Sequence, residues 1–202
     1  MIDEREDFIR VYSGAFAPAL ARQLCAHLKA LFGQGFGKRR QAAGSGHPKT
    51  VHDDQQIWDI RDVDAADYRG TIMPALFECL KSYVDEFDIL ASFTLVGWSL
   101  KAQLTRKGEG YHAWHFESAS FAESKRVLAW SIYLNDDYEG GELEFLYFGK
   151  RIKLGEGDIV IFPAAFTHTH RGNMVLGGEK LLLTGWYELV PEDPATPAEP
   201  RE

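Results

Sequence analysis

Residues that could bind a metal ion occur at two places in the chain. His115 and Glu117 lie two positions apart, and His168 and His170 follow about fifty residues later. Side chains at positions i and i+2 of a strand project to the same face, so His115 and Glu117 could contact one ion from a single strand. Two imidazoles and one carboxylate on one face of a metal form the ligand set of non-haem iron(II) oxygenases. The spacing predicts a metal site that the 168–170 segment completes.

Bulk composition excludes several other classes of protein. The 202 residues are 45% hydrophobic and carry a net charge of −8, which suits one globular domain and argues against a nucleic-acid-binding surface. No apolar run approaches the ~20 residues that a membrane span needs, and the acidic N-terminus lacks the apolar core of a signal peptide. Cys25 and Cys79 fall in predicted helices and are expected to be buried thiols, so we expect a reducing, cytoplasmic location.

The first ninety or so residues show helical periodicity. Apolar residues at helical spacing predict helices over about 17–32 and 71–87, with Pro74 in the first turn of the second. Between the helices, residues 33–50 are rich in glycine and contain Lys38, Arg39 and Arg40. This segment is either a solvated surface loop or a lid that contacts substrate.

From residue 92 the pattern changes to short strands separated by glycine-containing turns. Strands are expected over 93–105, 111–117, 127–134, 142–147, 150–154, 158–162 and 180–188. This order predicts a mainly β fold with flanking helices: a jelly roll or cupin-like barrel with the N-terminal helices packed outside. We expect a single domain over 1–190, with a helical part at about 15–90 and a β core at about 92–190. The proline-rich stretch 191–202 is expected to be a disordered tail.

The second half, over about 100–188, resembles the prolyl 4-hydroxylase-like Fe(II)/2-oxoglutarate-dependent dioxygenases, which have a double-stranded β-helix. Three blocks carry the resemblance: 110–117; Arg126 with 132–135, 140–145 and 157–163; and His170 with Gly178, Lys180 and Trp186. The N-terminal helices match this family only in general character.

The resemblance implies that His115 and Glu117 are metal ligands, although the usual acid is Asp. His168 and His170 are both candidates for the distal ligand. In the family a basic residue follows the distal histidine by about ten positions, and counting back from Lys180 favours His170. His168 would then orient a ligand or line the pocket.

The same resemblance implies a role for Lys180, which lies beside the apolar run 181–183. It would pair with the distal carboxylate of 2-oxoglutarate, because a buried anion needs a fixed cation. Tyr133 resembles the family tyrosine that hydrogen-bonds this carboxylate. Trp186 is expected in the pocket wall or the core, and Trp130 in the core or at the rim, like His112 and Trp114.

The implied activity is hydroxylation of a C–H bond in an amino-acid residue or small molecule, with Fe(II), 2-oxoglutarate and O2 as cofactors and ascorbate as a candidate further one. The expected partner is a small-molecule, peptide or protein substrate, and neither nucleic acid nor membrane. Two alternatives remain: a non-catalytic jelly-roll protein that binds a metal or small ligand, and a zinc hydrolase, since two His and one Glu also suit catalytic zinc. Neither alternative explains the position of Lys180.

Overall fold

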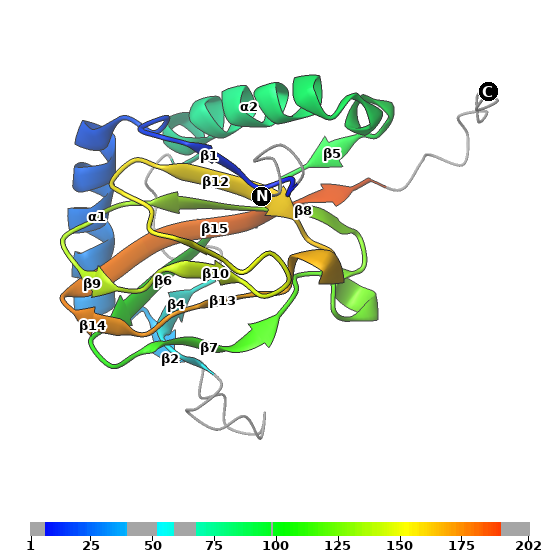
Figure 1. Cartoon of the computed structure of the whole chain (residues 1–202). Coiled ribbons are helices and arrows are strands. Elements are labelled where there is room, and N and C mark those ends of the chain that lie inside the picture. The colour runs from blue at the N-terminus through cyan, green and yellow to red at the C-terminus, as the bar shows by residue number, and fades with distance from the viewer. Residues whose placement is uncertain (1–6, 40–51, 59–67, 98, 191–202) are drawn as a thin grey trace.

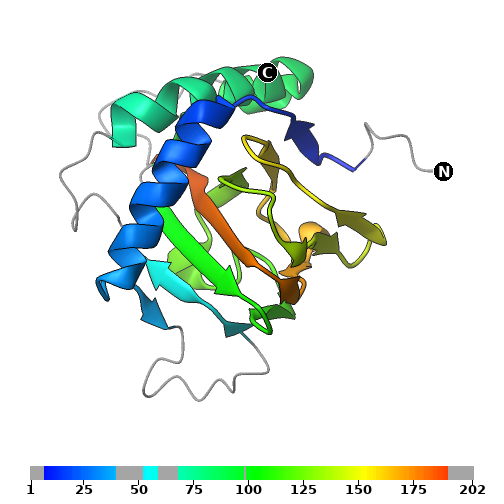
Figure 2. The same ribbon diagram turned by 90° about the vertical axis from the view of Figure 1, so that its left-hand side faces the viewer.

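In the computed structural model, which describes residues 7–39, 52–58, 68–97 and 99–190, two antiparallel sheets face each other and two helices cover the larger sheet (Figures 1 and 2). The larger sheet has the order β1 (Arg10–Tyr12), β12 (Ile159–Pro163), β8 (Arg126–Tyr133), β15 (Glu179–Leu189), β6 (Lys101–Arg106), β4 (Gln55–Ile57) and β2 (Lys38–Arg39), and β5 (Leu95–Val96) pairs with β15. The smaller sheet has the order β11 (Lys150–Ile152), β10 (Leu143–Phe145), β13 (His170–Gly172), β7 (Gly110–His115) and β3 (His52–Asp53). A third pair joins β14 (Val175–Gly177) to β9 (Glu139–Gly140).

Side chains of β8 point alternately to the helices on one face of the larger sheet and to the space between the sheets on the other. Leu128, Trp130 and Ile132 belong to the apolar cluster shared with the helices, whereas Ala129 and Tyr133 belong to the cluster between the sheets. The two sets are interleaved because successive strand residues point to opposite faces. One face of the strand therefore packs against the helices, and the other face lines the space between the sheets.

The helices α1 (Pro18–Gly33) and α2 (Tyr68–Glu86) pack on the outer face of this sheet, as predicted. Short 3-10 helices follow at η2 (Asp88–Ser92), η3 (Phe121–Glu123) and η4 (Phe166–His168). The placement of Pro74 in a first turn was wrong, because Tyr68, which is 2% exposed, packs on the core and starts the helix earlier. None of the described helices is long and apolar enough to cross a membrane. Cys25 and Cys79 are buried free thiols.

Several strands differ from the sequence-based expectation. The predicted strand 93–105 is divided into β5 and β6, and four short N-terminal strands join the sheets without having been predicted. Those strands, β1 to β4, are two or three residues long, too short to show an alternating pattern. Part of the predicted glycine-rich loop forms β2, while residues 40–51 lie outside the described residues, as does the predicted tail 191–202. The single-domain boundary at 190 stays a prediction.

Candidate active site

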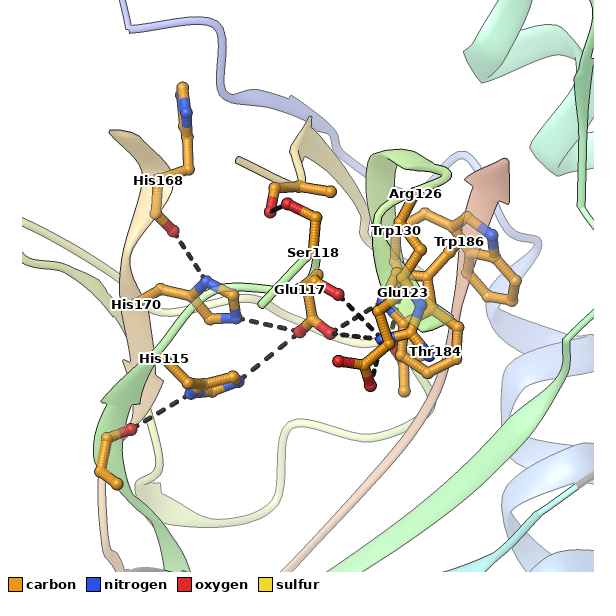
Figure 3. A network of polar contacts seen from close by, with 12 residues as sticks. His115, Glu117, Ser118, Glu123, Arg126, Trp130, His168, His170, Thr184 and Trp186 are labelled. Atoms are coloured by element: carbon orange, nitrogen blue, oxygen red, sulfur yellow. Dashed lines mark hydrogen bonds and ion pairs between the residues drawn. The ribbon is translucent and has the colours of Figure 1, made fainter. Parts of the chain in front are cut away.

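Three ligand-type side chains meet between the two sheets. His115 is the last residue of β7, His170 is the first residue of β13, and the two are paired across the strands. The Nε2 atoms of His115 and His170 lie 3.5 and 3.3 Å from the same oxygen, Oε1 of Glu117 (Figure 3). The candidate ligand atoms all lie within 4.8 Å of one another. The arrangement is that of a small metal site with two nitrogen ligands and one oxygen ligand.

Glu117 reaches this position by a route that the sequence did not indicate. The expectation that His115 and Glu117 project from one strand was wrong, because β7 ends at His115. The backbone N–H groups of Glu117 and Ser118 both donate to the carbonyl of Ala164, each at 3.1 Å. A turn fastened to the end of β12 therefore brings the carboxylate back toward the imidazoles.

Both imidazoles are held in one tautomer. Nδ1 of His115 lies 3.1 Å from the carbonyl oxygen of Ala113, and Nδ1 of His170 lies 2.9 Å from that of His168. A carbonyl oxygen can only accept a hydrogen bond, so each Nδ1 carries the hydrogen. In the neutral rings each Nε2 then directs a lone pair toward Glu117, which is the tautomer that a metal ligand needs.

The charge state of the group calls for a cation. Burial lowers the pKa of the His115 imidazole, which favours its neutral form. Burial alone would raise the pKa of the Glu117 carboxyl, but the adjacent His115 and His170 hold that pKa well below its ordinary value. Two imidazole nitrogens and one carboxylate oxygen that converge this closely need a positive charge between them, which either a proton or a bound metal ion supplies. The donor set therefore fits a divalent metal such as Fe(II).

His168 lies apart from this group. Its Nε2 donates to the backbone carbonyl of Asp7 at 2.7 Å, and its Nδ1 lies 3.0 Å from Oγ1 of Thr167. His168 and His170 do not lie on one strand, because the chain changes from η4 to β13 between them. His168 thus ties the N-terminal segment to the β core, and its backbone carbonyl orients the ring of His170.

A cavity of about 270 Å³ lies between the sheets. His115, Glu117 and His170 line it, and so does Lys180. Lys180 is 4% exposed, and its Nζ donates to the carbonyl of Gly141 at 2.8 Å. Within the described part of the chain no carboxylate lies at ion-pair distance from Nζ. Burial lowers the pKa of this amine to about 8. A buried ammonium that has a hydrogen bond to a carbonyl but no ion pair in the described structure would be stabilised by binding an anion.

Tyr133 and Tyr111 line the same cavity. Tyr133 is 3% exposed, and burial raises the pKa of its phenol, so the hydroxyl stays a neutral donor. The ring of Tyr111 stacks on that of His115 with 3.7 Å between centroids. This contact was not predicted, although Tyr111 and His115 are four residues apart on one strand and thus share a face.

Glu117 has two further neighbours that the sequence did not reveal. Nε1 of Trp186 donates to Oε2 of Glu117 at 2.8 Å, and Nη1 of Arg126 donates to the backbone carbonyl of Glu117 at 2.9 Å (Figure 3). The other residues singled out lie elsewhere: Trp130 is buried toward the helices, and Trp114 is 37% exposed under the guanidinium of Arg171.

Residues 102–188, which include the candidate ligands and Lys180, match the family model described as the 2OG-Fe(II) oxygenase superfamily. Over these residues, hereafter the 2OG oxygenase segment, the chain is similar to that superfamily. The resemblance to prolyl 4-hydroxylase-like enzymes that was predicted from the sequence is confirmed. The segment covers most of the two sheets and leaves out the N-terminal helices.

Similar proteins support this assignment. The chain is 30% identical over 120 residues to a PKHD-type hydroxylase of Synechococcus sp. strain CC9902, a match that covers 56% of this chain and 53% of that protein. The chain thus matches about half the length of this curated relative.

Among solved structures, a Pseudomonas putida prolyl-4-hydroxylase aligns with a TM-score of 0.69 at 20% identity, covering 90% of this chain and 93% of that one. A prolyl hydroxylase of Trichoplax adhaerens, solved in complex with a hypoxia inducible factor peptide fragment, gives 0.70 at 16% identity, covering 90% and 84%. At such identities the likeness concerns the fold, and it confirms the predicted double-stranded β-helix of the 2OG oxygenase segment.

Proposed function

We propose that the chain is an Fe(II)- and 2-oxoglutarate-dependent hydroxylase that acts on a C–H bond of an amino-acid residue or a small molecule. One observation carries the proposal: the group of His115, Glu117 and His170 shares a cavity with Lys180, a buried cation without a carboxylate partner among the described residues. A non-catalytic metal protein or a zinc hydrolase would need the ligands but not this second, anion-seeking site. The match to the 2OG-Fe(II) oxygenase superfamily supports the same reading.

In this proposal His115, Glu117 and His170 hold Fe(II). With 2-oxoglutarate, the ion supplies activation of O2, with release of succinate and CO2 and transfer of one oxygen atom to the substrate. The protein contributes fixed positions, because the carbonyls of Ala113 and His168 hold the two imidazoles in one orientation.

Lys180 and Tyr133 would receive the distal carboxylate of 2-oxoglutarate. Both side chains are buried, both line the cavity, and each offers a donor hydrogen. A charge-assisted hydrogen bond from a buried ammonium is stronger than one between neutral groups. The anion would also relieve the burial cost that lowers the pKa of Lys180.

The remaining wall of the cavity would face the substrate. It includes Trp58, Lys101, Ser131 and Thr184, which mix apolar, polar and charged groups. The Trichoplax adhaerens prolyl hydroxylase was solved with a peptide, so a peptidyl residue is one class of substrate to test, beside free amino acids and other small molecules.

Anaerobic addition of Fe(II) and 2-oxoglutarate tests the proposal directly. The expected result is a weak visible charge-transfer band that needs both additions and fades on admission of air, with formation of succinate. A zinc hydrolase or a non-catalytic protein would give no such band. Mass spectrometry of candidate substrates, seeking the added oxygen atom, would then identify the class that is hydroxylated.

A further inference from the structure

The two oxygens of Glu117 have different partners. Oε1 faces the Nε2 atoms of His115 and His170 at 3.5 and 3.3 Å. Oε2 points the other way: it accepts a hydrogen bond of 2.8 Å from Nε1 of Trp186, and Nη1 of Arg126 lies 3.8 Å from it. Figure 3 shows the carboxylate between the imidazole pair on one side and the indole on the other.

The indole of Trp186 is itself held firmly. Trp186 is 3% exposed on β15 and pairs with Ala129 of β8. The guanidinium of Arg126 lies 3.7 Å from the centre of its ring, and the ring of Trp58 stacks on it at 5.9 Å with an interplanar angle of 20°. The N–H group therefore has a fixed direction.

The length of the side chain at position 117 matters for this contact. Glu117 begins in a turn on the β7 side, whereas Trp186 lies on a strand of the larger sheet. An aspartate would end about 1.5 Å short of the glutamate oxygens, one carbon–carbon bond less. The extra methylene lets one carboxylate reach the imidazoles and the indole together.

We infer that Trp186 is a positioning residue, whose indole N–H holds Oε2 of Glu117 so that Oε1 alone is presented between the two imidazoles. The inference rests on the proposed metal site. Related sites have aspartate at this position. Here the longer glutamate reaches a hydrogen-bond donor, Trp186, on the opposite sheet. Partners that orient a ligand in this way typically affect metal affinity by 10–100-fold.

Binding of Co(II), followed by its visible absorption without any turnover, separates this role from packing. Trp186→Phe keeps most of the ring but removes the N–H, and it should weaken Co(II) binding by roughly 10-fold or more. Trp130→Phe is the matched control, because Trp130 is 2% exposed on the neighbouring strand and its Nε1 has no hydrogen-bond partner in the described structure. That variant should bind Co(II) as the unaltered protein does.

The outcomes distinguish the inference from the proposed function. If the unaltered protein does not bind Co(II), the metal site itself is refuted, and the positioning role with it. If the unaltered protein binds Co(II) and Trp186→Phe binds equally well, only the positioning role is refuted. Equal weakening in both tryptophan variants would assign the effect to packing and would also overturn the inference.

A double-mutant cycle with Glu117→Asp adds an independent test. In the Glu117→Asp background, Trp186→Phe should change Co(II) affinity by less than about twofold, because the shorter carboxylate does not reach the indole. A loss as large as in the unaltered background would mean that Trp186 acts without Glu117.

Indole N–H signals in the ¹⁵N spectrum keep the inference testable should Trp186→Phe fail to fold. The chain has five tryptophans, and one indole signal should move strongly upfield in Glu117→Ala, since a hydrogen bond to a carboxylate is lost. If no indole signal moves, the hydrogen bond between Trp186 and Glu117 does not exist in solution.

Discussion

The buried position of Lys180 disfavours its charged form unless an anion binds beside it. Its side chain comes from the cavity face of β15, and its single described hydrogen bond goes to the carbonyl of Gly141. Loss of water lowers its pKa to about 8, so the free protein carries a group that is costly to keep charged.

Lys180→Met should raise the dissociation constant for 2-oxoglutarate by about two orders of magnitude, because breaking a buried ion pair costs ~3–5 kcal/mol. Lys180→Arg should have a milder effect, since the charge is retained but the planar guanidinium needs different room. Anaerobic titration of the Fe(II)-loaded protein with 2-oxoglutarate measures both. Fe(II) affinity is the internal control and should be nearly unchanged. A 2-oxoglutarate affinity that survives Lys180→Met would remove Lys180 from the site.

The lowered pKa of Lys180 predicts how the free energy of unfolding of the ligand-free protein depends on pH. The pKa of Lys180 falls from an ordinary value of 10.5 to about 8 on folding, so between these values the unfolded chain binds the proton and the folded chain does not. This group's contribution to the free energy of unfolding should therefore rise with pH from about 8 to 10.5, with its full destabilising effect present below pH 8.

Denaturant unfolding of the unaltered protein and Lys180→Met across this range isolates the effect, because other groups contribute equally to both. The difference between the two proteins should shrink as the pH rises. A difference that does not change with pH would show that Lys180 is not buried in solution.

The two distal histidines should respond oppositely to substitution. His170→Ala, like His115→Ala, should abolish Co(II) or Fe(II) binding, because each removes one of three ligands. His168→Ala should retain the metal but unfold at a lower temperature, since it loses the hydrogen bond to the Asp7 carbonyl. Metal titration and thermal unfolding of the three variants check this. Loss of metal in His168→Ala with retention in His170→Ala would reverse the assignment.

At the scale of elements, β15 shows what could be predicted from the sequence. Its even-numbered residues Lys180, Leu182, Thr184 and Trp186 line the cavity, and its odd-numbered residues Leu181 and Leu183 contact the helix-covered cluster. The apolar run and the alternation are both visible in the sequence, so the strand and the unusual place of Lys180 could be inferred.

Other contacts at the site could not be read in this way, because they depend on the ends of elements. Glu117 is placed by hydrogen bonds to Ala164, which is 47 residues away, and no local pattern encodes that pairing. The break between η4 and β13 that separates His168 from His170 has no glycine or proline to mark it. The hydrogen bond from Trp186 to Glu117 joins two segments that the fold alone brings together.

Gly185 is the position in β15 where a larger residue should fail. A Cβ atom there would collide with the backbone oxygen of Ser99 and with the ring of Trp130. Gly185→Ala should therefore lower the free energy of unfolding by about 1–3 kcal/mol. Gly33→Ala, at the end of α1 where a Cβ atom would meet nothing within 4 Å, is the matched control and should be neutral or stabilising. Denaturant unfolding compares them, and equal stabilities would contradict the prediction.

At the scale of the whole molecule, the segment from Asp7 to Tyr12 joins parts that are otherwise separate. The Asp7 carboxylate pairs with Lys150 of the smaller sheet at 2.6 Å, and its carbonyl accepts from His168. Arg10 pairs with Glu86 of α2 at 2.6 Å, and β1 adds to the edge of the larger sheet beside β12. The segment thus links both sheets and a helix close to the candidate site.

Binding of a metal at the candidate site should therefore raise the free energy of unfolding of the whole fold. Co(II) at a hundredfold excess over its dissociation constant should add about 2.7 kcal/mol to the free energy of unfolding, because it binds only the folded chain. Thermal unfolding with and without Co(II) measures this, and a chelator should reverse it. The increase should be absent in His115→Ala. An equal increase in that variant would place the bound metal elsewhere.

The alternation along β8 and β15 also gives a rule for changing what the protein acts on. Ser131 and Thr184 face each other across the two strands and look into the cavity, while the residues on either side of them face the helix layer or the helix-facing ring of Trp130. A mutant library restricted to these two positions would vary the cavity wall without touching the packing beneath α1 and α2. Most of its members should still fold, so selection would act on substrate preference and would not be dominated by loss of structure.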